Sequence, residues 1–96
     1  MRTGPPGVPT ELRVRERDGG IELLWRNPMR RSWFRIEIAE GSPSAGSWQS
    51  SSDWSSTKGR FTFTGLKPHT AYWFRVKAFN TNGESNWSDF VCGRPR

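Results

Sequence analysis

Residues 66–80 read Leu66-Lys67-Pro68-His69-Thr70-Ala71-Tyr72-Trp73-Phe74-Arg75-Val76-Lys77-Ala78-Phe79-Asn80. Successive side chains of a β-strand point to opposite faces, so the alternation in this stretch predicts one long strand over 70–80. One face would carry Tyr72, Phe74, Val76 and Ala78, and the other Trp73, Arg75, Lys77 and Phe79. Gly65 ends the preceding strand, and Pro68 fixes its own φ, so the chain turns before the long strand begins.

The same period of two recurs along the chain. We expect strands at 12–15, 21–26, 33–38, 47–50, 61–64, 70–80 and 87–92. Turn signals separate them: Asp18-Gly19-Gly20 and Asn82-Gly83 favour tight hairpins, and Asn27-Pro28 stops the second strand. No segment shows a helical period. The pattern predicts an all-β, seven-stranded antiparallel Greek-key sandwich.

Four spacings in this order carry a family resemblance: Pro9-x-x-Leu12-x-Val14, Ile21-x-Leu23-x-Trp25, Phe34-x-Ile36-x-Ile38 and Leu66-x-Pro68-x-Thr70-x-Tyr72. Together they resemble the fibronectin type III domain. We expect the fibronectin type III domain over 9–92. The glycines and prolines before it favour an extended lead-in at 1–8, and residues 93–96 are expected to be a tail. The resemblance also implies a tyrosine corner at Tyr72 and a structural core that includes Trp25, Leu66, Tyr72 and Phe74.

Composition fits one small domain. The chain has 96 residues, of which 32% are apolar, yet it contains six Trp, six Phe and one Tyr. Aromatic side chains bury large areas, so these residues can support a thin core. Cys92 is the only cysteine, which excludes a disulfide within the chain. No stretch approaches the roughly 20 apolar residues of a membrane helix, so we expect no membrane insertion.

Catalysis is not expected. His69 is the only histidine, and it stands in the turn before Tyr72 with no nucleophile paired to it by spacing. One histidine and one cysteine do not make a zinc site. Gly19-Gly20 opens a strand and not a helix, so it is not a phosphate loop. We therefore predict no enzyme activity, no cofactor and no metal.

The candidate site is the outer face of the sheet that holds the long strand. Its predicted members are Trp33, Arg35, Trp73, Arg75, Lys77 and Trp87. Cations placed over indole faces attract them, so these residues can form a stabilising ladder. Tryptophan and arginine are also common interface anchors, so the same face can bind a partner. Nearby, the segment 85–90 partly resembles the Trp-Ser-x-Trp-Ser element of cytokine-receptor domains, with Phe90 about where the second Trp would stand.

Two further tryptophans, Trp48 and Trp54, lie in a Ser-rich region and are candidate loop contacts. Either the indoles fold back over the sandwich, or they remain open to a sugar ring or a protein pocket. The formal net charge of +6 favours acidic partners. We do not expect nucleic-acid binding, because no nucleic-acid-binding motif accompanies the charge.

These observations favour a non-catalytic structural or protein-interaction module, a spacer or docking domain of a surface protein or of a larger assembly, a virion included. The alternative is a receptor-like or carbohydrate-binding module that uses the exposed Trp and Arg residues. The expected partners are other proteins, with a glycan as the alternative. Met1 is not followed by a signal peptide. An extracellular or surface location is expected if the sequence is part of a longer chain, and an intracellular or virion location if Met1 is the native start.

Overall fold

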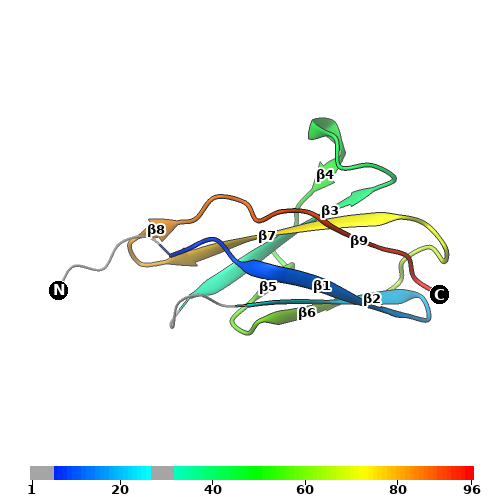
Figure 1. The fold of residues 1–96 in the computed structure, drawn as a ribbon, viewed down its shortest axis with the longest axis horizontal. Helices are drawn as coiled ribbons and strands as arrows, with labels where there is room; N and C mark the ends of the chain where they lie inside the picture. Colours follow the sequence, from blue (N-terminus) through cyan, green and yellow to red (C-terminus); the bar gives the residue numbers. More distant parts are fainter. Residues whose placement is uncertain (1–5, 27–31) are drawn as a thin grey trace.

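The computed structural model describes residues 6–26 and 32–96, which form two antiparallel sheets packed face to face (Figure 1). The first sheet contains β1 (Thr10–Arg17), β2 (Gly20–Arg26) and β6 (Arg60–Phe63) in the order β1-β2-β6. The second contains β4 (Trp48–Gln49), β3 (Trp33–Glu40), β7 (Tyr72–Asn80) and β8 (Gly83–Glu84) in that order. Two short strands complete it: β5 (Ser55–Ser56) pairs with β3, and β9 (Val91–Gly93) pairs with β7. The all-β sandwich expected from the sequence is confirmed.

The core lies between the sheets and consists of the apolar residues that the alternation placed inward. Strands β2 and β6 supply Ile21, Leu23, Trp25 and Phe63; strands β3 and β7 supply Phe34, Ile36, Ile38, Tyr72, Phe74, Val76 and Ala78. Of the core residues predicted from sequence, Trp25, Tyr72 and Phe74 are buried, and Leu66 is half-buried against the cluster. The pairing of β3 with β7 runs from Trp33 opposite Phe79 to Glu40 opposite Tyr72, which fixes the inner and outer faces of both strands.

A tyrosine corner closes one end of the sandwich. The backbone N–H of Lys67 donates a hydrogen bond of 2.9 Å to the hydroxyl oxygen of Tyr72. His69 follows with a φ of 62°, in the left-handed region, and its backbone N–H donates to the carbonyl oxygen of Pro95 at 2.8 Å. The loop before β7 therefore holds both the buried tyrosine ring and the C-terminal residues.

The strand count and the last strand differ from expectation. The described part of the chain has nine strands and not seven. Two short strands, β4 and β5, pair with the same edge of β3, and two more, β8 and β9, pair with β7. The last strand covers Val91–Gly93, so the prediction of a strand over 87–92 is wrong for residues 87–90. A short 3-10 turn, η1, covers Ala45–Ser47.

The expected termini also differ in detail. Residues 93–96 are not a free tail: Gly93 belongs to β9, Pro95 is buried, and Arg96 exchanges backbone hydrogen bonds with Arg17 and Gly19. Of the expected lead-in, residues 1–5 lie outside the described residues, and Pro6 is buried. The stop at Asn27-Pro28 also lies outside them. Cys92 is a free, half-buried thiol opposite Trp73. No helix in the described ranges could span a membrane.

Candidate functional site

The outer face of β7 holds a continuous stack of aromatic rings and cations. The guanidinium carbon of Arg75 lies 4.4 Å from the ring centre of Trp48 and 4.4 Å from that of Trp87. The stack continues beyond Trp87 to the Nζ of Lys77, 4.6 Å away, and beyond Trp48 to the ring of Phe90, 5.3 Å away. We call these five residues, Phe90, Trp48, Arg75, Trp87 and Lys77, the ladder. It draws together segments that are far apart in the sequence.

Carboxylates complete the ladder at its edges. Glu37 on β3 stands opposite Arg75, and its Oε1 accepts hydrogen bonds of 2.9 and 2.6 Å from Nε and Nη2 of that arginine. Lys77 pairs with Glu84 at 3.2 Å. Only 21% of the Arg75 side chain and 17% of the Glu37 side chain are exposed, so solvent screens this pair less than a surface ion pair. Two indoles and a carboxylate therefore contact the guanidinium of Arg75.

Two serines hold the segment 85–90 against β7. The hydroxyl of Ser85 accepts a hydrogen bond from the backbone N–H of Ala78, and that of Ser88 accepts one from Val76, each at 2.9 Å. The backbone N–H groups of the same serines donate to the carbonyl oxygens of Ala78 and Val76 at 2.9 Å. Both hydroxyls replace the backbone acceptors that a regular strand would offer. This is why residues 87–90 are not a strand and why Trp87, between the serines, reaches over the cations.

The structure separates the six residues of the predicted face. Arg75, Lys77 and Trp87 are in the ladder. Trp73 is half-buried, and its indole N–H donates to the carbonyl oxygen of Gly41 at 3.2 Å. Trp33 lies flat on Phe79, with ring centres 4.3 Å apart, and is 44% exposed. Arg35 is exposed, and its side chain makes no ion pair or hydrogen bond with other described residues.

The two loop tryptophans have different surroundings. Trp48 is in the ladder. Trp54 packs on the core with its ring edge against Phe63, 5.4 Å between centres, and its carbonyl oxygen accepts a hydrogen bond from the N–H of Ile36. Both indoles contact residues of the domain itself, which supports the alternative in which they fold back over the sandwich.

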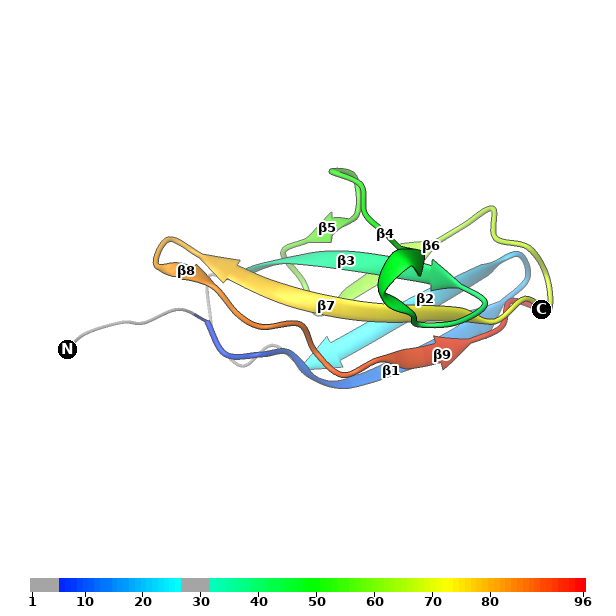
Figure 2. The ribbon, with the colours of Figure 1, turned by 90° about the horizontal axis from the view of Figure 1, so that it is seen from above.

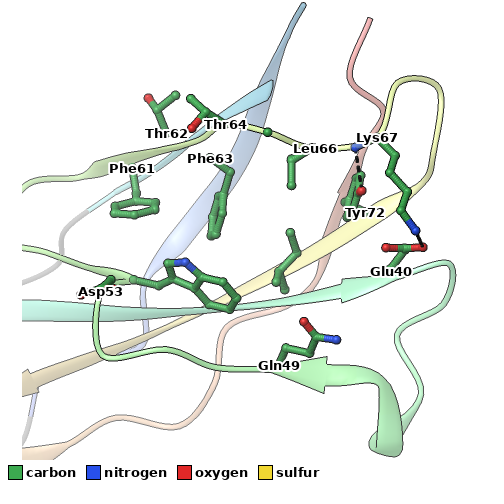
Figure 3. A pocket seen from close by; sticks show the side chains of 13 residues that line it. Glu40, Gln49, Asp53, Phe61, Thr62, Phe63, Thr64, Leu66, Lys67 and Tyr72 are labelled. Atoms are coloured by element: carbon green, nitrogen blue, oxygen red, sulfur yellow. Dashed lines mark hydrogen bonds and ion pairs between the residues drawn. The ribbon is translucent and has the colours of Figure 1, made fainter. Parts of the chain in front are cut away.

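A groove of about 480 Å³ lies along the open edge between β6 and the β4–β5 side (Figure 3). Phe61 and Phe63 reach it from β6, and Gln49 from β4 (Figure 3). At one end Lys67 forms an ion pair of 3.1 Å with Glu40, beside the Tyr72 hydroxyl. No nucleophile is paired with a base among these residues. Within the described ranges, no group of three His, Cys, Asp or Glu side chains could hold a metal ion.

Comparison with known proteins decides the family. The sequence profile described as the fibronectin type III domain matches residues 7–93. The chain belongs to this family. This fibronectin type III domain is 29% identical over 94 residues to the human interleukin-6 receptor subunit beta. The match covers 94% of this chain but only 10% of that protein. The domain therefore spans about a tenth of the length of this curated relative.

Solved fibronectin type III domains have the same fold. The FN1–FN3 domains of chicken CNTN1 match with a TM-score of 0.75 at 21% identity, covering 96% of this chain and 33% of that one. The FN5 domain of Drosophila Lar matches with a TM-score of 0.68 at 22% identity, covering 94% and 96%. At these identities the likeness to solved structures speaks to fold alone.

Sequence reasoning did not include Glu37, Ser85, Ser88 and Phe90 as members of the site. The sequence held a sign of the two serines: in Ser85-Asn86-Trp87-Ser88 two hydroxyl side chains lie three residues apart, with a tryptophan between them. The signal for Glu37 was its place on the same face of β3 as Arg35. Phe90 lies about where the Trp-Ser-x-Trp-Ser element would have its second tryptophan. In this fibronectin type III domain Phe90 is the end of the ladder, packed on Trp48.

Proposed function

We propose that this domain is a rigid spacer in a receptor-like chain at the cell surface. The observation that carries the proposal is the position of the chain ends. The described chain begins near the β7–β8 hairpin, and its C-terminus lies at the β1–β2 turn, at the opposite end of the long axis (Figures 1 and 2). With its ends at opposite ends of the long axis, such a domain separates the modules before and after it by about its own length.

The exit end is held firmly, which a spacer requires. Three backbone hydrogen bonds fix the last two residues: Arg96 N–H to Arg17 at 2.9 Å, Gly19 N–H to Arg96 at 3.2 Å and His69 N–H to Pro95 at 2.8 Å. They tie the C-terminus to β1 and to the tyrosine-corner loop at once. The receptor subunit among the relatives supports the surface setting.

Single-molecule energy transfer tests the spacer proposal. In a Cys92→Ser background, dyes are attached at Val8→Cys and Arg96→Cys, at opposite ends. A control pair at His69→Cys and Arg96→Cys lies at one end. We expect a single narrow peak at the long separation for the first pair and high transfer for the second. A broad distribution for the first pair would contradict a rigid spacer.

A second candidate function, docking of a partner protein, is favoured by Trp33. Trp33 is 44% exposed and lies two residues before Arg35 on the same face of β3, and exposed Trp and Arg are typical anchors of protein interfaces. Sedimentation of the wild type and of Trp33→Ala tests whether the partner is a second copy. A concentration-dependent dimer that Trp33→Ala abolishes would place the interface there. Monomers in both cases would contradict self-association through this face.

A further inference from the structure

Among the described residues, the excess of positive charge is concentrated on one sheet face. The described residues include twelve Arg or Lys and nine Asp or Glu. Five of these arginines and two of the glutamates lie on the outer face of the β1-β2-β6 sheet: Arg13, Arg15, Arg17, Arg26, Arg60, Glu11 and Glu22. The remaining described residues hold seven cations and seven carboxylates, which cancel. The excess of three positive charges that the described residues carry is therefore on this face, which we call the arginine face.

Strand register arranges these arginines in rows. Arg13, Arg15 and Arg17 alternate along β1, so their side chains share the outer face and follow one another at about 7 Å. Leu24 of β2 is paired with Arg13 on one side and with Arg60 of β6 on the other. Two guanidiniums thus flank one aliphatic side chain across about 10 Å of a three-stranded surface.

The acidic residues of the face compensate some arginines and not others. Glu22 accepts a hydrogen bond of 2.9 Å from Arg17 and lies 3.8 Å from Arg15. The hydrogen bond from Arg17 holds the pKa of Glu22 below its ordinary value, and the charges of Arg17, Arg15 and Arg60 act in the same direction. Glu11 pairs with Arg26 at 3.3 Å.

Arg13 and Arg60 have no carboxylate partner among the described residues. The guanidinium of Arg13 donates only to a backbone carbonyl, that of Glu11, at 3.3 Å. Arg60 forms no ion pair there. Both side chains are exposed, so their donors are open to an external anion.

We propose that the arginine face binds a sulfated linear polysaccharide. The guanidinium fork suits the oxygens of a sulfate, as it suits those of a carboxylate or a phosphate, because it presents parallel N–H donors. None of the described outward residues of β1, β2 and β6 is aromatic; Trp33 belongs to the other sheet, and Trp87 and Phe90 of the ladder come only as far as the edge beside Glu11. Bases of a single strand would therefore have nothing to stack on. A sheet surface also lacks the protruding helix or ribbon that enters a DNA groove. The choice of glycan rests on the surface setting proposed above.

The test measures binding of a heparin-derived octasaccharide by titration calorimetry over a range of salt concentrations. Arg13→Ala/Arg60→Ala should weaken binding about tenfold or more and lower the slope of log affinity against log salt by about two, one for each lost contact. The matched control, Arg35→Ala/Lys67→Ala, removes the same charge elsewhere and should change the affinity much less. Glu22→Gln frees Arg15 and Arg17 and should tighten binding severalfold, whereas Glu40→Gln should not.

Three results would overturn the inference: equal losses in the two double variants, no binding of the octasaccharide by the folded wild type, or equally strong binding of a short DNA duplex. Circular dichroism establishes that each variant is folded. Energy transfer between the chain ends does not depend on the arginine face. A failed titration with an intact long separation therefore rejects the glycan site alone, and a broad separation rejects the spacer.

Discussion

Arg75 offers the sharpest test of how the ladder stabilises the domain. Its guanidinium makes two hydrogen bonds to Glu37 and lies between two indoles, each 4.4 Å away. Removing a charged hydrogen-bond partner costs about 1.5–3 kcal/mol, and each indole contact contributes about 0.5–1 kcal/mol. These effects overlap, because the same group makes all the contacts. We expect Arg75→Ala to lower the free energy of unfolding by about 2–3 kcal/mol.

The control is Arg35→Ala, one strand away on the same sheet face. It removes an equal charge from a side chain with no ion pair among the described residues, so its effect should be within about 0.5 kcal/mol. Urea denaturation followed by circular dichroism measures both. A double-mutant cycle with Trp87→Leu should give a coupling of about 0.5–1 kcal/mol. Equal midpoints for Arg75→Ala and Arg35→Ala, with no coupling to Trp87, would refute the reasoning.

Three further predictions concern single contacts. Tyr72→Phe removes the acceptor of the Lys67 N–H and should cost about 1–2 kcal/mol in urea denaturation, and an unchanged midpoint would show that the tyrosine corner is not stabilising. Ser88→Ala leaves the buried N–H of Val76 without its hydroxyl acceptor and should cost about 1–3 kcal/mol, whereas exposed Ser52→Ala should be neutral. Because the pKa of Glu22 is lowered in the folded state, its contribution to stability is present above the ordinary glutamate pKa and is lost as the pH falls through the lower value. Glu22→Gln should therefore flatten the acid limb of the stability–pH curve, and an unchanged limb would contradict the Arg17–Glu22 contact.

The fold could be predicted because its main strands are amphipathic along their whole length. In β3 and β7 alternate residues are apolar, from Phe34 to Ile38 and from Tyr72 to Ala78, so only one register buries both sets. The edge regions lack that constraint. Residues 41–59 are rich in Ser and Gly; the expected strand at 47–50 is confirmed as β4, but β5 was not predicted, because its two residues depend on contacts with β3 that no local pattern encodes.

The candidate site was only partly predictable for a related reason. Alternation shows which face a residue occupies, and so it placed Arg75 and Lys77 outward on the same face of β7. It does not show which indole reaches them. Trp48 arrives from the β4 edge and Trp87 from the segment held by Ser85 and Ser88, so the order of the stack depends on the tertiary fold.

The outward arginines of the two sheets differ in how far other side chains surround them, and this difference affects which face can bind an anion. On β7, Arg75 is enclosed by two rings and a carboxylate, so an incoming anion would have to displace contacts that are already made. On β1 and β6, Arg13 and Arg60 are exposed and have no carboxylate partner among the described residues, so an anion displaces only water and counterions. Tryptophan beside arginine in the sequence first pointed to β7 as the binding face. The contacts of Arg75 support a stabilising role for the ladder, and the two exposed arginines without a carboxylate partner support the proposal that the arginine face binds a charged partner.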